Sequence, residues 1–283
     1  MEVTSDAHRK SGRTAAFFDV DNTVVRGASA FHLARGLWQR DYFTFSDIVR
    51  FGWATANYTL FGESKEQLDH VREHGLEIIK GWSVAEMTAV GEEVYDELLA
   101  MRIFPGTKAI IDSHLARGHE VWLVTASPIE IGRMIARRLG ATGALGTEAE
   151  HVGGYYTGKL NGGFLHGDLK ATRIRELAER TGIDLARSHA YGDSLNDVPM
   201  LEAVGKPCPI NPDPRMRKLA RDRGWPVREF RKRSKSGRRG IVKSSITGAA
   251  WVTIQVGRGI RAAIRTALRL PRRRGHADES KDL

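Results

Sequence analysis

The sequence predicts an α/β fold, in which helices cover both faces of a mostly parallel sheet. The first observation is that short apolar segments alternate along the chain with helical patterns, which is typical of parallel sheets. The second is that several apolar segments end in polar clusters, as strands do at the binding edge of such a sheet. The third is a length of 283 residues, which is enough for a sizeable core and one or two domains.

The elements follow in chain order. Five apolar segments are predicted to be buried strands, at 14–18, 120–125, 144–147, 188–191 and 206–210. Helical periodicity falls between them, at 105–117, 129–139, 170–181 and 198–203. Strands that alternate with helices in this way are expected to pair in parallel and to bind ligands at their carboxyl ends.

Two insertions interrupt this alternation. The longer one, 24–104, has helical patterns at 31–40, 45–60, 66–79 and 83–101, so we expect a helical unit. The shorter one, 151–167, alternates glycine with Tyr155, Tyr156, Leu160 and Phe164, which predicts a short β-hairpin or flap.

The positive charge is concentrated at the C-terminal end. The net charge is +10, but 231–283 carries 15 Lys/Arg against three Asp/Glu, or +12, and the remaining residues carry −2. Within this tail, 246–270 is amphipathic, with one basic stripe formed by Arg258, Arg261, Arg265, Arg269 and Arg272. Two interpretations fit equally well: a helix that lies on an anionic membrane surface, and a solvated basic tail. Nucleic-acid binding is disfavoured, because Trp251 is the tail's one aromatic residue and no stacking ladder is visible.

The compartment is predicted from what the sequence lacks. Cys208 is the single cysteine, which excludes an internal disulfide framework and suits a reducing compartment. Residues 1–13 have no apolar run of the signal-peptide kind, and no stretch of about 18 apolar residues predicts a transmembrane helix. We therefore expect a cytoplasmic protein, peripheral at the inner membrane face if the tail binds lipid.

The first strand is followed by a pair of carboxylates. Asp19 and Asp21 are two residues apart, and in a strand such residues face the same side. Two like charges held close together need a cation, a shared proton or both, and a hard oxygen-binding cation such as Mg²⁺ fits. The simpler interpretation is an ordinary turn, in which Asp and Asn are common.

Two more strands also end in polar clusters. The second strand is followed by Thr125-Ala126-Ser127-Pro128, and the fourth by Gly192-Asp193-Ser194-Leu195-Asn196-Asp197. Lys170 opens the helix before the fourth strand. Three polar strand ends with a lysine between them suit one task, which is to hold a phosphoryl group and a divalent cation.

These motifs, in this order, resemble those of haloacid dehalogenase (HAD) superfamily hydrolases of subfamily IB, the phosphoserine phosphatase-like group. The resemblance covers about 14–230 and extends to Ile210-Asn211-Pro212-Asp213. It implies a Rossmann-like core formed by 14–23 and 105–230, a helical cap formed by 24–104, and a separate tail at 231–283. It also implies a Mg²⁺-dependent phosphatase that forms an aspartyl-phosphate intermediate.

The resemblance also assigns roles to residues. Asp19 is the implied nucleophile, and Asp21 is the general acid and then the base. Asp19, the backbone carbonyl of Asp21, and Asp193 are the implied Mg²⁺ ligands. Thr125 and Lys170 are implied to bind the substrate's phosphate, and Asn196 and Asp197 to support the metal ligands from behind.

Simpler interpretations of the same residues remain open. Thr125 or Ser127 could cap the following helix. Lys170 could be an exposed lysine in a first helical turn, and Asp197 could be the N-cap of the helix at 198–203.

The substrate is less well defined by the sequence. Phosphoserine phosphatases place a glutamate just after the first motif, where it meets the substrate's amino group, and the position that we match to it is Ala28. We therefore expect a small phosphomonoester, with phosphoserine itself, and hence a role in serine biosynthesis, as the alternative. The same fold could also serve a phosphomutase or a regulatory protein without catalytic activity.

Overall fold

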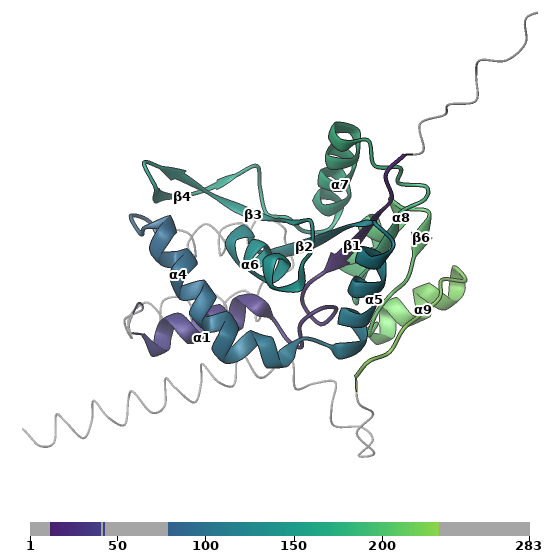
Figure 1. Ribbon diagram of the computed structural model, residues 1–283, viewed down its shortest axis with the longest axis horizontal. Helices are drawn as coiled ribbons and strands as arrows, with labels where there is room; N and C mark the ends of the chain where they lie inside the picture. The colour runs from purple at the N-terminus through teal and green to yellow at the C-terminus, as the bar shows by residue number, and fades with distance from the viewer. Residues whose placement is uncertain (1–11, 41, 43–78, 232–283) are drawn as a thin grey trace, which may run out of the picture.

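A six-stranded sheet forms the centre of the protein (Figure 1). The computed structural model describes residues 12–40, 42 and 79–231. The strand order is β4-β3-β2-β1-β5-β6, and all neighbours pair in parallel except β3 and β4, which are antiparallel. The strands are β1 (Ala15–Asp19), β2 (Glu120–Pro128), β3 (Gly143–Val152), β4 (Tyr155–Asn161), β5 (His189–Tyr191) and β6 (Lys206–Pro207). The predicted α/β fold with a mostly parallel sheet is confirmed.

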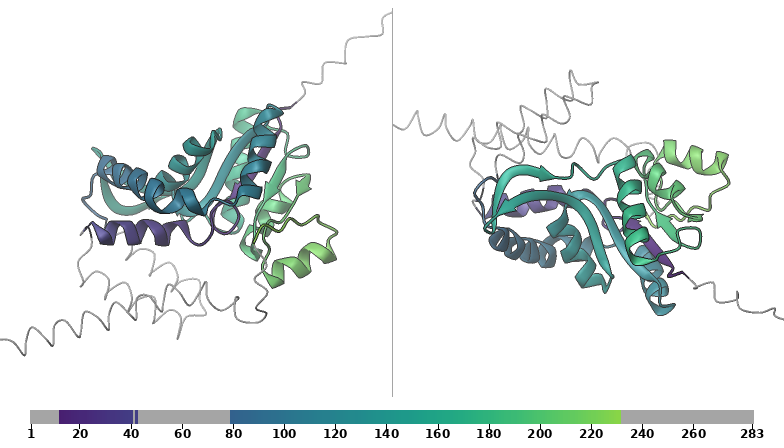
Figure 2. Two further views of the ribbon diagram at one scale, coloured as in Figure 1. Left: turned by 60° about the horizontal axis from the view of Figure 1, so that its bottom comes forward. Right: turned by 90° about the horizontal axis from the view of Figure 1, so that it is seen from above.

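Helices pack on both faces of this sheet, as the side views show (Figure 2). The described helices are α1 (Ser29–Gln39), α4 (Val84–Val94), α5 (Pro105–Ala116), α6 (Ile129–Leu139), α7 (Asp168–Thr181), α8 (Val198–Glu202) and α9 (Pro214–Asp222). Strand β1 is buried along its whole length, and its side chains alternate between two hydrophobic clusters. Ala16 and Phe18 pack with α5 and α6, whereas Ala15 and Phe17 pack with α7, α8 and α9.

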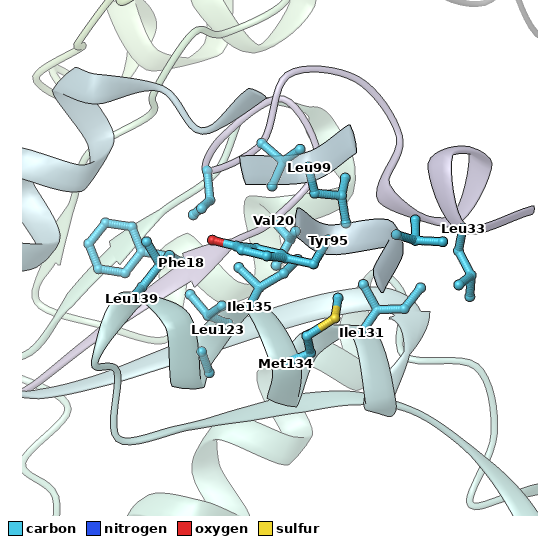
Figure 3. Packing of buried hydrophobic residues seen from close by; sticks show 14 of the residues in the cluster. Phe18, Val20, Leu33, Tyr95, Leu99, Leu123, Ile131, Met134, Ile135 and Leu139 are labelled. Atoms are coloured by element: carbon cyan, nitrogen blue, oxygen red, sulfur yellow. The ribbon is translucent and has the colours of Figure 1, made fainter. Parts of the chain in front are cut away.

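The described part of the long insertion packs directly on the core. Leu33 of α1 and Leu99, which follows α4, belong to the same buried cluster as Phe18 and Ile135 of α6 (Figure 3). The helix predicted at 83–101 is observed in three parts, because α4 ends at Val94 and continues as a π-helix (Tyr95–Leu99) and a 3₁₀ turn (Ala100–Arg102). The helices predicted at 45–60 and 66–79 lie outside the described residues, apart from Ile79.

The hairpin predicted at 151–167 begins earlier than expected, because β3 does not stop at Thr147. The first half of β3 pairs with β2, and the second half of β3 continues past the edge of the parallel sheet to pair with β4. Gly153 and Gly154 form the turn, with φ angles of 60° and 84°. Two positive φ angles are what a tight two-residue hairpin loop requires. The hairpin then contacts the insertion, because the Tyr156 N–H donates to the Trp82 carbonyl at 3.0 Å.

The predicted strand 206–210 is shorter as a regular strand, because β6 comprises Lys206–Pro207. Pro207 and Pro209 have no N–H to donate to a neighbouring strand. Between and after them, the N–H groups of Cys208 and Ile210 donate to the carbonyls of Ala190 and Gly192, both at 2.9 Å. The segment therefore stays attached to β5 through alternate residues.

Helix α9 was not expected from the helical pattern. Its start is a local one, because Asp213 is the N-cap, its side chain accepts the Met216 N–H at 2.7 Å, and Pro214 follows. The tail helix predicted at 246–270 lies outside the described residues. No helix among those described is long and apolar enough to cross a membrane.

Candidate active site

The predicted polar strand ends meet at one edge of the sheet. Strand β1 lies between β2 and β5, and the chain moves from β1 outward to β2, β3 and β4 before it crosses to β5 on the other side. The carboxyl ends of β1, β2 and β5 therefore surround the point where the strand order reverses, which is where open α/β sheets bind ligands.

Lys170 lies at the centre of this edge. It projects from the first turn of α7, is 3% exposed, and its Nζ lies 2.6 Å from Asp19 Oδ1 and 2.7 Å from Asp197 Oδ1. Burial alone would lower the pKa of Lys170, but the two carboxylates together raise it above its ordinary value. The ammonium is therefore charged at neutral pH, and the interpretation of Lys170 as an exposed lysine is wrong.

Three carboxylates lie close to one another at this position, and two of them contact the Lys170 ammonium. One oxygen from each of Asp19, Asp193 and Asp197 lies within 4.8 Å of the other two. Burial and the charge of Asp197 raise the pKa of Asp19 well above its ordinary value, although Lys170 opposes this. Burial and Asp197 likewise raise the pKa of Asp193, to about 8. A single ammonium does not compensate two buried carboxylates and a third that is half-buried, and their hard oxygen atoms fit a cation such as Mg²⁺.

Asp197 and Asp193 differ in how their oxygens are used. Oδ1 of Asp197 accepts from Lys170, and its Oδ2 accepts the backbone N–H groups of Asp193 at 3.1 Å and Ser194 at 3.2 Å. Asp197 is thus fully engaged in holding Lys170 and the loop that carries Asp193. By contrast, no described residue donates a hydrogen bond to the Asp193 carboxylate. Gly192 permits this arrangement, since a Cβ there would lie 2.5 Å from Asp197 Cβ.

Asp21 lies beyond the end of β1, and a chain of hydrogen bonds connects it to β2. Its Oδ1 accepts the backbone N–H of Ser29, the first residue of α1, at 2.8 Å. The Ser29 hydroxyl lies 2.9 Å from the Ser127 hydroxyl, and the Ser127 N–H donates to Thr125 Oγ1 at 3.0 Å. Burial raises the pKa of Asp21, and the hydrogen bonds from Ser29 oppose that rise.

Thr125 is buried, and its position excludes one simpler interpretation. Helix α6 begins at Ile129, and its N-cap residue Pro128 makes no side-chain cap, so neither Thr125 nor Ser127 caps this helix. Because Thr125 Oγ1 accepts the Ser127 N–H, its own hydroxyl proton is left to donate toward a ligand.

Asn196 is not brought into this cluster. It is exposed on the 3₁₀ turn Leu195–Asp197, and none of the described residues forms a hydrogen bond with its side chain. Asn196 faces solvent, whereas Asp197 is buried and accepts hydrogen bonds from Lys170 and from the loop that carries Asp193.

Two residues of the site were missed by the sequence reasoning, Ser29 and Asn211. The buried Asn211 donates from Nδ2 to the Asn22 carbonyl at 3.0 Å, and its Oδ1 accepts the Phe230 N–H at 2.7 Å. Asn22 has a φ of 61°, so this contact supports a left-handed residue in the loop after β1. The sequence held a signal for each of these residues. Asn211 belongs to the segment Ile210-Asn211-Pro212-Asp213 that carries part of the family resemblance, and Ser29 is a serine just before the helical pattern at 31–40.

The comparisons with known proteins agree with this geometry. The family model described as haloacid dehalogenase-like hydrolase matches residues 16–202. A Mycobacterium tuberculosis protein named phosphoserine phosphatase SerB1 is 52% identical over 237 residues, which are 83% of this chain and 77% of that protein. A solved Bordetella pertussis structure of unknown function is 29% identical with a TM-score of 0.70, and the match covers 78% of this chain and all of that one.

A solved phosphoserine phosphatase with an analogue of its phospho-aspartyl intermediate shares the fold. Its TM-score is 0.52 at 18% identity, and the match covers 79% of this chain and 95% of that one. The predicted family, fold and hydrolase class are thereby confirmed. From the motifs, the strand order and these matches together, the chain belongs to the haloacid dehalogenase-like hydrolases.

Proposed function

We propose that the protein is a Mg²⁺-dependent phosphatase that hydrolyses a small phosphomonoester through an aspartyl-phosphate on Asp19. Hydrolysis of phosphoric monoesters agrees with the family and with the phosphatase name of the M. tuberculosis relative. The observation that carries the proposal is the ammonium of Lys170 held between Asp19 and Asp197, with Asp193 alongside. This arrangement places positive charge beside a buried carboxylate, where an incoming phosphate dianion needs it.

The chain's own residues divide the chemistry between them. An oxygen of Asp19 attacks phosphorus, a bond forms between them, and the bond from phosphorus to the ester oxygen breaks. Asp21 gives its proton to the departing alkoxide, and its raised pKa favours the protonated form that this step needs. Asp21 then takes a proton from water, which attacks phosphorus and releases inorganic phosphate and Asp19.

Further groups position the phosphoryl group. Lys170 offsets the negative charge of the phosphate and of Asp19, and the Thr125 hydroxyl donates to a phosphate oxygen. Asp19, Asp193 and the backbone carbonyl of Asp21 would hold Mg²⁺, which when bound neutralises negative charge between the nucleophile and the phosphate. Asp197 keeps Lys170 and Asp193 in place.

The substrate proposal rests on the insertion. Ala28 is exposed in the structure and offers no carboxylate for an amino group. We therefore favour a small phosphomonoester other than phosphoserine. Phosphoserine remains the alternative because of the relative's name.

The test is phosphate release from a panel of esters that includes phosphoserine and lysophospholipid phosphates, with and without Mg²⁺. Asp19→Asn should abolish release, whereas Asp112→Asn should leave it unchanged, because Asp112 is an exposed partner of Lys108 on α5. Full activity in Asp19→Asn would refute the nucleophile. Transfer of the phosphoryl group to another hydroxyl would indicate a phosphomutase. No release from any ester by folded, Mg²⁺-loaded protein would favour a non-catalytic regulatory protein.

We further infer a cytoplasmic location with peripheral contact to anionic membrane through the basic tail. The support is the charge of +12 on 231–283 and the single cysteine of the chain. Deletion of 243–283 should abolish sedimentation with vesicles containing anionic lipid and leave phosphate release unchanged. Equal sedimentation of both proteins would refute the inference. We expect no nucleic acid among the partners.

A further inference from the structure

Three histidines gather at the end of the sheet opposite to the candidate active site. His114 comes from the last turn of α5, His119 precedes β2, and His189 is the first residue of β5. One ring nitrogen from each lies within 4.8 Å of the other two. The active-site aspartates follow the carboxyl ends of the strands, whereas these histidines lie at the amino ends, so the two clusters are separate.

The orientation of His114 is set by its neighbours. Its ring is buried, and its Nε2 lies 2.8 Å from the hydroxyl of Tyr191, which itself stacks on Phe18 with ring centroids 4.4 Å apart. Its other nitrogen, Nδ1, lies 2.9 Å from Nδ1 of His119. The ring of His189 packs edge-on against His114, at 4.6 Å between centroids. When Nε2 of His114 donates to Tyr191, the lone pair of its Nδ1 faces Nδ1 of His119.

The surroundings keep the three imidazoles neutral. Burial, helped by neighbouring positive charges, lowers the pKa of all three, to about 4 for His114 and His189. Neutral imidazole is the form that binds metals. The positive charges of Arg117 and Lys206 repel any metal ion at this cluster, so weak electrostatic binding of a hard cation such as Mg²⁺ is disfavoured. A bound metal ion must therefore form strong bonds to imidazole nitrogen.

We propose that His114, His119 and His189 form a second metal site, for Zn²⁺ or another transition metal that prefers imidazole, with a fourth position open to solvent. Zn–N bonds of about 2.0–2.1 Å in a tetrahedral site place ligand nitrogens about 3.3 Å apart. The Nδ1 atoms of His114 and His119, now 2.9 Å apart, would therefore separate slightly, and a ring nitrogen of His189 would take the third position. When Nδ1 of His119 binds the metal ion, this imidazole carries its proton on Nε2. Metal binding therefore releases no proton from the three histidines.

The Tyr191 hydroxyl acts as the partner that orients a metal-binding histidine. Such partners typically contribute about 10–100-fold to metal affinity. A bound ion would also join the end of α5 to the starts of β2 and β5, and would stabilise the fold by mass action.

The experiment is a Zn²⁺ titration of the tag-free full-length protein against a chromophoric chelator, with Mg²⁺ in excess to occupy the carboxylate cluster. Absorption of bound Co²⁺ in the visible region reports the tetrahedral geometry. The test variants are His119→Gln and His189→Gln, which change half-buried residues and retain both His114 and its partner Tyr191. Tyr191→Phe tests the orienting hydroxyl.

Two controls separate this cluster from the remaining histidines. His151→Gln changes an exposed histidine on β3. The double variant His70→Gln/His74→Gln removes a pair spaced four residues apart that lies outside the described residues. Asp193→Asn tests whether Zn²⁺ instead occupies the carboxylate cluster.

We expect one equivalent of Zn²⁺, bound at least about tenfold more weakly by each of the two test variants. Tyr191→Phe should weaken binding by roughly 10–100-fold. The controls and Asp193→Asn should bind as the unaltered chain does. The inference is overturned if no equivalent binds, if both test variants bind unchanged, or if binding is lost in Asp193→Asn or in the His70/His74 variant. In any of those cases the histidines are a packing cluster.

Discussion

Replacement of Asp197 by asparagine should destabilise the protein, because one carboxylate oxygen accepts from the buried Lys170 and the other from two part-buried backbone N–H groups. Oδ1 accepts from Lys170, and Oδ2 accepts from the N–H groups of Asp193 and Ser194. The asparagine amide has one acceptor oxygen and one NH₂ group. In either orientation its N–H groups therefore point at a donor, which is either Lys170 or the backbone N–H groups of Asp193 and Ser194. Asp197 is 1% exposed, so water does not relieve the conflict.

The magnitude follows from the two orientations. If the amide oxygen faces the backbone, the hydrogen bond to Lys170 is lost, and such a bond to a charged group contributes about 1.5–3 kcal/mol. If it faces Lys170, two part-buried N–H groups lose their acceptor, at a cost of up to about 1–3 kcal/mol each. Loss of the negative charge of Asp197 partly offsets this destabilisation, because it removes repulsion of the Asp19 and Asp193 carboxylates. That repulsion raises the pKa of both groups beyond the effect of burial. We expect a net loss of roughly 2–4 kcal/mol, or a Tm lower by about 5–15 °C.

The matched variant is Asp193→Asn, which changes the neighbouring carboxylate. No described residue donates to that carboxylate, so its neutralisation removes repulsion and breaks no bond within the described structure. Without Mg²⁺, Asp193→Asn should melt at or above the temperature of the unaltered protein, whereas Asp197→Asn should melt well below it. Both should lose phosphate release.

The assay is thermal unfolding in EDTA, followed by circular dichroism, because bound Mg²⁺ would stabilise the native state and mask the difference. If Asp197→Asn unfolds at the same temperature as the unaltered protein, Asp197 does not hold Lys170 and the loop, and the assigned division of roles is wrong. An equal fall in Tm for both variants would refute it as well.

Three further predictions concern the same edge of the sheet. Gly192→Ala should lower both Tm and phosphate release, because its Cβ would lie 2.5 Å from Asp197 Cβ; unchanged unfolding would contradict the close packing. Thr125→Val should lower kcat/KM roughly tenfold to a hundredfold through loss of one hydrogen bond to a charged phosphate, measured by phosphate release. Activity that survives intact would exclude Thr125 from phosphate binding. The pKa of Asp193 is raised from 3.8 to about 8, so in Mg²⁺-free protein the stability contributed by its protonated form is present below about pH 4 and lost as the pH rises to about 8. The Tm advantage of Asp193→Asn in EDTA should therefore grow from about pH 5 to pH 8, and a constant difference would show that this carboxyl does not titrate in that range.

Much of the fold could be predicted because its signals are local. The helix at 129–139 was predicted with its observed bounds, since its apolar residues repeat with the helical period and Gly140 ends it in a left-handed conformation. The strand at 144–147 was too short in the prediction, because only pairing with β4 shows that the chain continues as a strand beyond its pairing with β2. Prolines at 207 and 209 shortened the last strand for a reason that is visible in the sequence.

What the sequence by itself determined is the set of residues with the right chemistry, placed after apolar strands. Asp19, Thr125 and Asp193 stand out because hydrophobic patterning marks the strand ends, and a change of pattern is readable over a few residues. Only the tertiary structure decided which of these side chains meet. Lys170 and Asp19 are 151 positions apart, and Ser29 and Ser127 are 98 apart. The three histidines likewise meet only because β5 pairs with β1 and not with β4. Strand order follows from how the two faces of the sheet are buried together, and no local pattern encodes it.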